Sequence, residues 1–567
     1  VHVEKNSSVS WEVETSFSGN TAEGSGGALD VYDGSSASWG AELSLSNGST
    51  ASRSELTAFV GNTAKDVGGA VSIYDHAQVS WAASTMFSGN GAMKSGGAVN
   101  AGYGSTVSWT VETSFFNNSA HYGGAVLAGD DDSGAHWEGE TSFLANTAGW
   151  SGGALNVYNG ARMSWAAVTS FYNNSAIYGG AILIGEDSTV SWEAGTSFSG
   201  NTAEGSGGAL NAFDNCSVYW KADTYFTNNT ANYAGAIYAF NNSNVTWNAD
   251  TSFSGNIADE SGGAVLIDHG CSLSWGAETS FLNNTAGGSG GAVYMSSLVS
   301  GSEDVFSSLT IEGETKFLEN SCGADGGAMS LIGSISFDFR TESITYMRNF
   351  AAVAGGAVFI AGAGIGPKLV GVEFNSNSAF VGGGVYVTGS GNTITEYEFR
   401  DPTTFDRCQF IGNTATAGGA VNSGAGQDVF NNTLFRRNGA RSGGALSLAG
   451  QASLEHCTFV DNTASEDEGP AISNVGHIAT IRRASFAGNV FECELGMFLN
   501  YSTSGDIFDA VCKGFNTNCT ECDYGPAEKI VPLCSPEPEH SKSDGGTHTI
   551  EMLKVDPGYW RAAKNST

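Results

Sequence analysis

The sequence predicts an all-β fold: a single right-handed parallel β-helix of about 17 coils, followed by a small disulfide-rich C-terminal segment. Three observations lead to this prediction. One motif recurs at a nearly fixed spacing, large residues occupy every second place within it, and long helical periodicity is missing. Of the 567 residues, 79 are glycine and only 8 are proline, which fits hydrogen-bonded strands joined by tight turns.

The recurring motif is an aromatic residue followed three places later by asparagine. It occurs seventeen times, led by Phe in all copies but one, where Tyr346 takes its place, and the usual spacing is 27–29 residues. A fixed period of this size indicates a solenoid or an array. The motif asparagines are Asn20, Asn62, Asn90, Asn118, Asn146, Asn174, Asn201, Asn229, Asn256, Asn284, Asn320, Asn349, Asn377, Asn413, Asn438, Asn462 and Asn489.

Two further sequence features recur at the same spacing. A Gly-Gly-Ala-aliphatic step follows most copies of the motif, and residues 15–29 are repeated letter for letter at 196–210. A tryptophan usually stands six residues before the Phe, and Trp39 is set apart from Phe59 by an insertion within 43–55. These tryptophans are Trp11, Trp39, Trp81, Trp109, Trp137, Trp165, Trp192, Trp220, Trp247 and Trp275.

The local pattern distinguishes strand from helix. In residues 107–115, VSWTVETSF, large or apolar residues occupy alternate places, which is the period of a strand. Two or three short strands per repeat, with glycine corners, describe a parallel β-helix. Equivalent residues would then stack: Phe on Phe, Trp on Trp, and Asn amides bonded from coil to coil. We therefore expect Trp109, Trp137, Trp165 and Trp192 to point inward.

A second, longer period appears in alternate repeats. At every second coil the residue before the motif asparagine is itself asparagine, which creates an N-x-[ST] sequon. Sugars on every coil would be only about 5 Å apart, whereas every second coil leaves about 10 Å. We predict N-glycans in one row, on Asn117, Asn173, Asn228 and Asn283.

Single sequons also occur elsewhere. Many arise by chance in a chain rich in Asn, Ser and Thr, so we treat them as weaker candidates for glycosylation. They are Asn6, Asn47, Asn215, Asn241, Asn244, Asn431, Asn500, Asn518 and Asn565.

The cysteines fall into two groups. Cys493, Cys512, Cys519, Cys522 and Cys534 crowd the C-terminal segment, where a cap without a large core is expected to need disulfides. Half a zinc site at 519–522 is the alternative, although no second Cys or His pair at zinc spacing follows.

The other five cysteines lie within the repeats, and four of them form two pairs that keep the same register. Cys216 and Cys271 would lie two coils apart, and so would Cys408 and Cys457, which is too far for a bond within either pair.

The net charge limits the kinds of partner that the chain is expected to bind. The formal net charge is −35, which makes nucleic acid a poor partner because binding it needs clustered Lys and Arg. No segment has the pattern of a transmembrane helix. We expect no cofactor, with calcium as the one candidate, at Asp130, Asp131 and Asp132.

Catalysis is not expected. Polysaccharide-cleaving β-helices need several acidic groups, or acid with Lys or Arg, converging on adjacent coils. Here the acidic residues stand mostly at outward positions such as Glu112, Glu140 and Glu278, and no nucleophile or metal-protease motif occurs. We predict no catalytic residues and no metal site, and keep a polysaccharide lyase or hydrolase as a distant alternative.

The paired motifs Phe-x-x-Asn and Gly-Gly-Ala-[Ile/Leu/Val] resemble the repeats of chlamydial polymorphic outer membrane proteins and of algal and protist β-helix proteins. The resemblance covers about residues 1–490. The four cysteines from Cys512 to Cys534 and the sequence DPGYWR at 556–561 look like the cysteine-rich segment that follows such β-helices. The resemblance implies secretion and display at a cell surface, in an adhesive or structural role.

We therefore expect a β-helix over 1–490 and a cysteine-rich segment over 491–567. The predicted function is that of an extracellular, glycosylated structural protein that binds itself head to tail, because no cap precedes the first coil and the C-terminal segment could cover it. The alternative is a cell-surface adhesin or carbohydrate-binding protein.

Overall fold

The computed structural model describes residues 1–567 except 12–14, 40–55, 131, 298–305, 363–365, 389–401, 425–426, 466–468, 475–478, 488, 492–496, 505–506, 515–547 and 551–567. It forms two compact units, Val1–Thr285 and Ala286–Thr567, and each is described by itself. The described residues form strands and turns with no helix. The strands run parallel and stack as a β-solenoid of about 15 turns, which confirms the predicted fold class.

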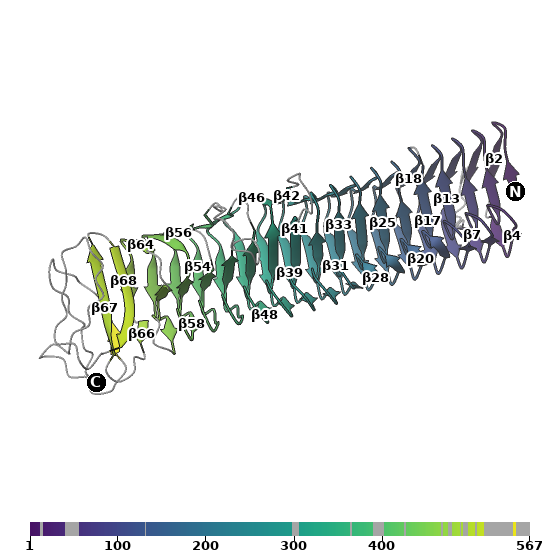
Figure 1. The fold of residues 1–567 in the computed structure, drawn as a ribbon. Coiled ribbons are helices and arrows are strands. Elements are labelled where there is room, and N and C mark those ends of the chain that lie inside the picture. The colour runs from purple at the N-terminus through teal and green to yellow at the C-terminus, as the bar shows by residue number, and fades with distance from the viewer. Residues whose placement is uncertain are drawn as a thin grey trace, which may run out of the picture. The chain divides into compact units, whose positions relative to one another are not determined.

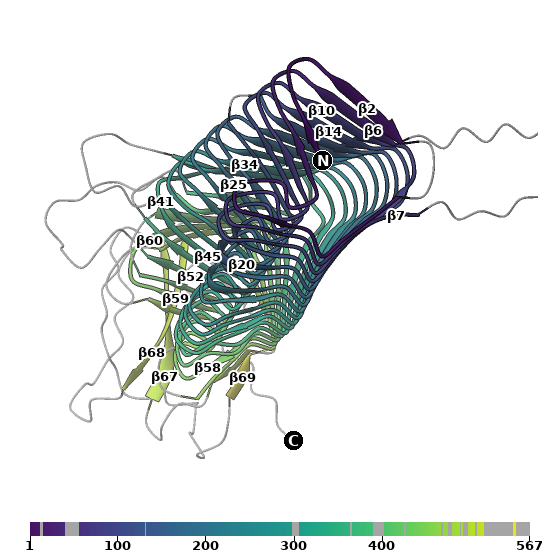
Figure 2. The same cartoon turned by 90° about the vertical axis from the view of Figure 1, so that its right-hand side faces the viewer.

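One coil of the first unit shows the plan. Its strands are β14 (Thr106–Trp109), β15 (Thr113–Phe116), β16 (Ser119–Tyr122) and β17 (Val126–Gly129). Each pairs in parallel with its equivalent one coil away, for example Trp109 with Trp137 and Phe115 with Phe143. The coil therefore has four strands rather than the two or three expected. Figure 1 shows the successive strands side by side, and in Figure 2 β10 (Gln78–Trp81) and β14 lie behind one another.

We name the four sheets of the first unit after their residues. The Trp sheet runs from β2 (Ser8–Trp11) to β38 (Ser272–Trp275), and the aliphatic sheet from β1 (His2–Val3) to β37 (Val265–Ile267). The Phe sheet contains β3 (Ser16–Ser18), β7 (Leu56–Val60), β11 (Ser84–Ser88), β15, β19 (Thr141–Leu144), β23 (Thr169–Tyr172), β27 (Thr196–Ser199), β31 (Thr224–Thr227), β35 (Thr251–Ser254) and β39 (Thr279–Leu282). The short sheet contains β4 (Thr21–Ala22), β8 (Thr63–Ala64), β12 (Gly91–Ala92), β16, β20 (Thr147–Ser151), β24 (Ser175–Tyr178), β28 (Thr202–Ser206), β32 (Thr230–Ala231) and β36 (Ile257–Ala258).

The second unit keeps the Phe ladder, but its described residues include no tryptophan. Its Phe strands are β43 (Thr315–Leu318), β47 (Ile344–Met347), β51 (Glu373–Asn375), β54 (Gln409–Ile411), β57 (Leu434–Arg436), β61 (Thr458–Val460) and β65 (Ser485–Ala487). A five-stranded sheet packs beside them, made of β50 (Lys368–Val370), β53 (Thr404–Asp406), β56 (Gln427–Asn431), β60 (Gln451–Glu455) and β64 (Ala479–Arg482). Phe405 and Phe430 stack in this sheet where tryptophans would stand, with ring centroids 4.9 Å apart.

The C-terminal part of the second unit changes strand direction. β67 (Met497–Ser504) and β68 (Ile507–Gly514) form an antiparallel hairpin, and β68 lies against β63 (Ile472–Asn474) and β64. This hairpin therefore lies against the last parallel strands (Figure 1).

The aromatic columns form the interior of the first unit. Trp109, Trp137, Trp165 and Trp192 are completely buried, which confirms their predicted inward orientation. Their rings stack at 4.6 to 5.0 Å between centroids. The Phe rings stack just as regularly, at 4.8 Å between Phe115 and Phe143. The two columns meet edge to face within most coils, as Trp109 and Phe115 do, an arrangement favoured by the ring quadrupoles.

The motif asparagine bonds one coil to the next, as predicted. The side-chain nitrogen of Asn118 donates to Oδ1 of Asn146 at 3.0 Å and to the carbonyl of Phe87 at 3.0 Å, and its backbone N–H donates to the same Oδ1. Asn118 and Asn146 are buried. Each amide thus satisfies buried backbone groups at the turn, which is why every coil needs this residue.

The Gly-Gly corner has a separate requirement at each residue. Gly123 has φ +61°, a left-handed conformation that disfavours a side chain. Gly124 has an ordinary φ, but a Cβ there would stand 2.1 Å from the carbonyl oxygen of Gly153 in the next coil. Corners of successive coils therefore touch backbone to backbone.

The two-coil period has a structural origin at this corner. In one type of coil the short strand ends in serine, whose hydroxyl accepts a hydrogen bond from an asparagine on the outer side of the aliphatic sheet: Asn156 to Ser151 and Asn211 to Ser206, both at 2.6 Å. In the other type Tyr122 or Tyr178 takes the place of serine, paired in register with it. The serine type inserts one extra residue as a β-bulge, and residues 196–210 form a coil of this type, whose short strand β28 ends at Ser206.

Replacing Trp165 by alanine should lower the free energy of unfolding by about 3–5 kcal/mol. The ring stacks on Trp137 and Trp192 and its N–H has no hydrogen-bond partner, so burial and stacking account for its contribution. Urea unfolding measures the change. Trp150→Ala is the matched control, because Trp150 is 45% exposed, and a loss there as large as that at Trp165 would contradict the inward column.

Candidate functional site: a row of exposed asparagines

The four predicted sequon asparagines occupy equivalent places, at the turn between the Phe sheet and the short sheet. Asn117, Asn173, Asn228 and Asn283 are all exposed, with φ between 52° and 54°. Asparagine is one of the few residues that adopts this left-handed conformation readily. Each is followed at once by a buried ladder asparagine, so the first amide of the pair is free for solvent while the second is held in the core.

The intervening coils carry small residues at this position. They are Gly89, Ala145, Gly200 and Gly255, and all have positive φ. A Cβ on Gly200 would stand 2.6 Å from Oδ1 of Asn173, and one on Gly255 would stand 2.4 Å from Oδ1 of Asn228. The asparagine side chain thus lies over the glycine of the next coil. Glycine thus leaves room for the larger side chain at Gly200 and Gly255, whereas the coil after Asn117 has the small Ala145.

The backbone of this turn is fixed by the stack. Asn117 donates its N–H to the carbonyl of Leu144 at 3.0 Å, and Asn173 donates to Ser199 at 3.0 Å. The row is therefore presented by rigid turns at regular intervals. Its chemistry is that of an exposed carboxamide whose nitrogen can be glycosylated, which is the modification that N-x-[ST] specifies.

The scattered sequons have more varied surroundings. Asn6, Asn215 and Asn241 are exposed with positive φ, and the Asn241 amide donates to Asp214. Asn244 and Asn431 are half-buried and donate to the Tyr219 hydroxyl at 3.3 Å and to Asp406 at 3.1 Å. A sugar at either of these two would have to displace a hydrogen bond. Asn47, Asn518 and Asn565, and the side chain of Asn500, lie outside the described part of the structure.

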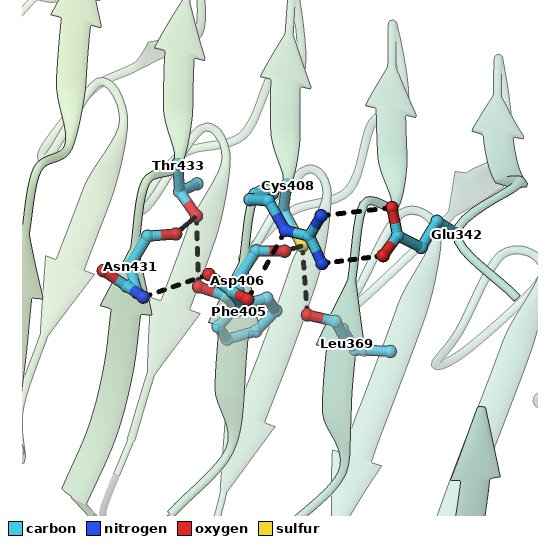
Figure 3. Close-up of polar contacts among 8 residues, drawn as sticks. Glu342, Leu369, Phe405, Asp406, Cys408, Asn431 and Thr433 are labelled. Carbon is cyan, nitrogen blue, oxygen red and sulfur yellow. Dashed lines mark hydrogen bonds and ion pairs between the residues drawn. The ribbon is translucent and has the colours of Figure 1, made fainter. Parts of the chain in front are cut away.

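The cysteines within the repeats are buried free thiols. Ser243 lies between Cys216 and Cys271, accepting from the N–H of Cys216 and donating its own N–H to Cys271 Sγ at 3.2 Å. This confirms the prediction that Cys216 and Cys271 lie too far apart to form a disulfide with each other. Figure 3 shows the Cys408 thiol beside Leu369, to whose carbonyl it donates at 3.4 Å, with Thr433 bonded in the same manner to Phe405 one coil on.

The cysteines that are predicted to form disulfides belong to the C-terminal segment. The side chains of Cys493, Cys512, Cys519, Cys522 and Cys534 all fall outside the described residues, so the disulfides stay a prediction.

We expect the thiols of the repeats to be unreactive in the folded protein. Burial raises the pKa of Cys216, Cys271, Cys322 and Cys408 to about 12 and that of Cys457 to about 11, from 9.0. Since the fold holds these protons more tightly than the unfolded chain does, their contribution to stability should persist below about pH 8 and fall as the pH rises from about 9 towards 12. Iodoacetamide labelling at pH 8.5, mapped by peptide, should modify them only in denaturant. Rapid labelling of any of the five in the native protein would contradict this.

The acidic residues named as outward-facing or as calcium candidates have separate surroundings in the structure. Glu112, Glu140 and Glu278 are exposed, as expected. Asp130 accepts from the Asn159 amide at 3.1 Å, and Asp132 lies 3.7 Å from Arg162. No group of three or more His, Cys, Asp or Glu that could hold a metal ion occurs among the described residues, which do not include Asp131.

One exposed feature escapes the sequence analysis. Trp150 lies on the bulge of β20, outside the buried Trp column, and is 45% exposed. Tyr178 approaches its ring at 5.4 Å edge to face, and His121 lies at 6.2 Å. The irregular spacing of Trp150, five residues before Leu155 rather than six before a Phe, is the signal that separates it from the core tryptophans.

The stacked columns, glycine corners and exposed turns define a β-solenoid repeat protein. Five segments, residues 14–31, 195–212, 223–239, 250–268 and 278–296, match the family model described as the Chlamydia polymorphic membrane protein (Chlamydia_PMP) repeat. The resemblance inferred from the motifs is confirmed at these places, and such repeats in a β-solenoid fit a surface-exposed protein. Comparisons with curated proteins and with solved structures found no match.

In the part of the chain that is described, no helix is long and apolar enough to cross a membrane.

Proposed function

We propose that this chain is a non-enzymatic, glycosylated structural protein of a cell surface or extracellular coat. The row of exposed asparagines at alternate coils supports this proposal most strongly. A scaffold that repeats the same turn at regular intervals can display sugars at regular intervals. The small residues in the coils between the asparagines leave room for the asparagine side chains. Glycans on one edge suit a protein that faces the outside of a cell.

The inward-facing side chains also support a structural role. The Trp, Phe and Asn columns are used in stacking and in coil-to-coil hydrogen bonds. The outward acidic residues give a charge of −35, which keeps copies apart laterally and attracts divalent cations that bridge them. We include head-to-tail association of copies in the proposal, because a stack of identical coils can continue from one molecule to the next as an open filament.

Imaging tests the structural role. Native material examined by negative stain should show regular filaments or a periodic coat, and antibodies should label intact cells from outside. Deleting residues 512–567 should leave soluble particles that no longer associate. Native protein that stays monomeric at high concentration with calcium, or labelling only after permeabilisation, would contradict the proposal.

A carbohydrate-binding adhesin is the second candidate, and the exposed aromatic cluster favours it. Trp150 and Tyr122 are exposed and Tyr178 is half-buried, on neighbouring coils, and exposed Trp and Tyr are common anchors in recognition sites. Screening against immobilised neutral oligosaccharides tests this role. Binding that Trp150→Ala abolishes and Trp165→Phe preserves would favour the adhesin over a purely structural protein.

A further inference from the structure

An exposed apolar strip runs along the outer side of the Phe sheet. It consists of Phe116, Leu144 and Tyr172, the last residues of β15, β19 and β23, which pair in register. Their exposed fractions are 46%, 37% and 49%. The same position is serine in the coils on either side, Ser88 and Ser199, so the strip is confined to three coils.

The strip coincides with the glycosylation row. Phe116 precedes Asn117 and Tyr172 precedes Asn173, while Leu144 precedes the small Ala145 between them. Both ends of the strip therefore adjoin a sequon asparagine, and the two asparagines are about 10 Å apart along the stack. Leu282, 39% exposed, stands in the same relation to Asn283. In the glycine coils this position is usually serine, as in Ser88–Gly89, Ser199–Gly200 and Ser254–Gly255.

The chemistry of the strip fits a sugar. Its three side chains carry no charge, and two of them are aromatic rings. A pyranose ring has an apolar C–H face and a hydroxyl rim, so it can cover such rings while its hydroxyls stay in water, and removing apolar surface from water is favourable. We propose that N-glycans at Asn117 and Asn173 fold back over Phe116, Leu144 and Tyr172 and shield them. This inference rests on the proposed glycosylation of the row.

Size argues against a protein partner at the same place. A stable protein interface takes about 800 Å² from each partner, which three half-exposed side chains cannot supply. Sugars at both ends would also obstruct a protein that approached the strip. The attached glycan needs no such area, because the covalent bond holds it beside the strip at a high effective concentration.

The first experiment measures shielding directly. The protein is produced in a glycosylating eukaryotic host, glycan occupancy is mapped by mass spectrometry, and hydroxyl-radical oxidation is measured residue by residue. The comparison is the double variant Ser119→Ala and Ser175→Ala, which removes both sequons and keeps both asparagines. Oxidation of Phe116, Leu144 and Tyr172 should rise about twofold or more in the variant, since an uncovered ring regains its contact with water.

Internal controls separate the possible failures. Tyr103 and Val168, which are 47% and 54% exposed and do not adjoin a sequon, should oxidise at the same rate in both proteins. Unoccupied Asn117 and Asn173 would refute the glycosylation on which the inference rests. Occupied sites with unchanged oxidation of the strip would overturn the shielding and leave the glycosylation standing.

A second variant tests the strip itself. Phe116→Ser with Tyr172→Ser places at both ends the residue that neighbouring coils already use, so the fold should be kept. Endoglycosidase should then release the glycans at Asn117 and Asn173 severalfold faster than in the unsubstituted protein. Release at Asn228, preceded by Thr227 rather than an apolar residue, should be unchanged. Equal release rates at all three sites in both proteins would contradict docking on the strip.

Discussion

Replacing Gly124 by alanine is expected to lower the free energy of unfolding by about 4 kcal/mol or more. The new Cβ would stand 2.1 Å from the Gly153 carbonyl oxygen and 2.5 Å from that of Thr147. Both are backbone atoms of the next coil, so no side chain can move aside and two coils must separate. Urea unfolding would measure the loss of stability. Amide hydrogen exchange in the strands from β16 to β20 would locate it.

Two other glycines serve as controls for that substitution. Gly160 has φ +77° but open space around it, so alanine should cost only about 1 kcal/mol through backbone strain. Gly24 has neither a positive φ nor a neighbour within 4 Å, and alanine there should be nearly neutral. If Gly124→Ala were no worse than Gly160→Ala, the close backbone contact between corners would be wrong.

Asn146→Ala is expected to lower the free energy of unfolding by about 3–5 kcal/mol, because each buried polar group left unpaired costs about 1–3 kcal/mol. The Asn146 amide accepts from the backbone and side-chain nitrogens of Asn118 at 3.0 Å each. It donates to the Phe115 carbonyl at 3.0 Å and to Asn174 at 3.1 Å. Alanine removes all four bonds within a fully buried site. Chemical denaturation monitored by tryptophan fluorescence provides the measurement.

The matched control for the ladder is Asn248→Ala. Asn248 is exposed and its backbone N–H donates to Trp220, a bond that alanine keeps, so the change should stay within about 0.5 kcal/mol. Similar losses at Asn146 and Asn248 would mean that the ladder amides add little to stability.

The regular parts of this fold could be predicted because they repeat. In every coil an aromatic residue is followed three places later by asparagine, as Phe115 is by Asn118. A stacked geometry is the simplest physical reason for such a column. The alternation of Asn117 with small residues likewise separated the candidate row from the ladder. Each of these inferences came from comparing copies within one chain.

The parts that escaped prediction are short or irregular. The short sheet has strands of as few as two residues, such as β12, too few to show an alternating pattern, so the coil was expected to have two or three strands rather than four. Trp150 lies on a bulge and keeps no fixed distance from the Phe column. The exposed strip depends on sheet register, which brings Phe116, Leu144 and Tyr172 together across repeats that are about 28 residues apart in sequence.

We propose that each Asn-Asn pair of the row divides two tasks, the first residue carrying a sugar outside and the second bonding coils inside. Site-resolved glycopeptide mapping of the native protein, with enzymatic release in heavy-oxygen water, tests it most directly. We expect modification at Asn117, Asn173, Asn228 and Asn283, and none at Asn118, Asn174, Asn229 or Asn284. Unmodified asparagine at all four outer positions, or a glycan on any of these ladder positions, would contradict it.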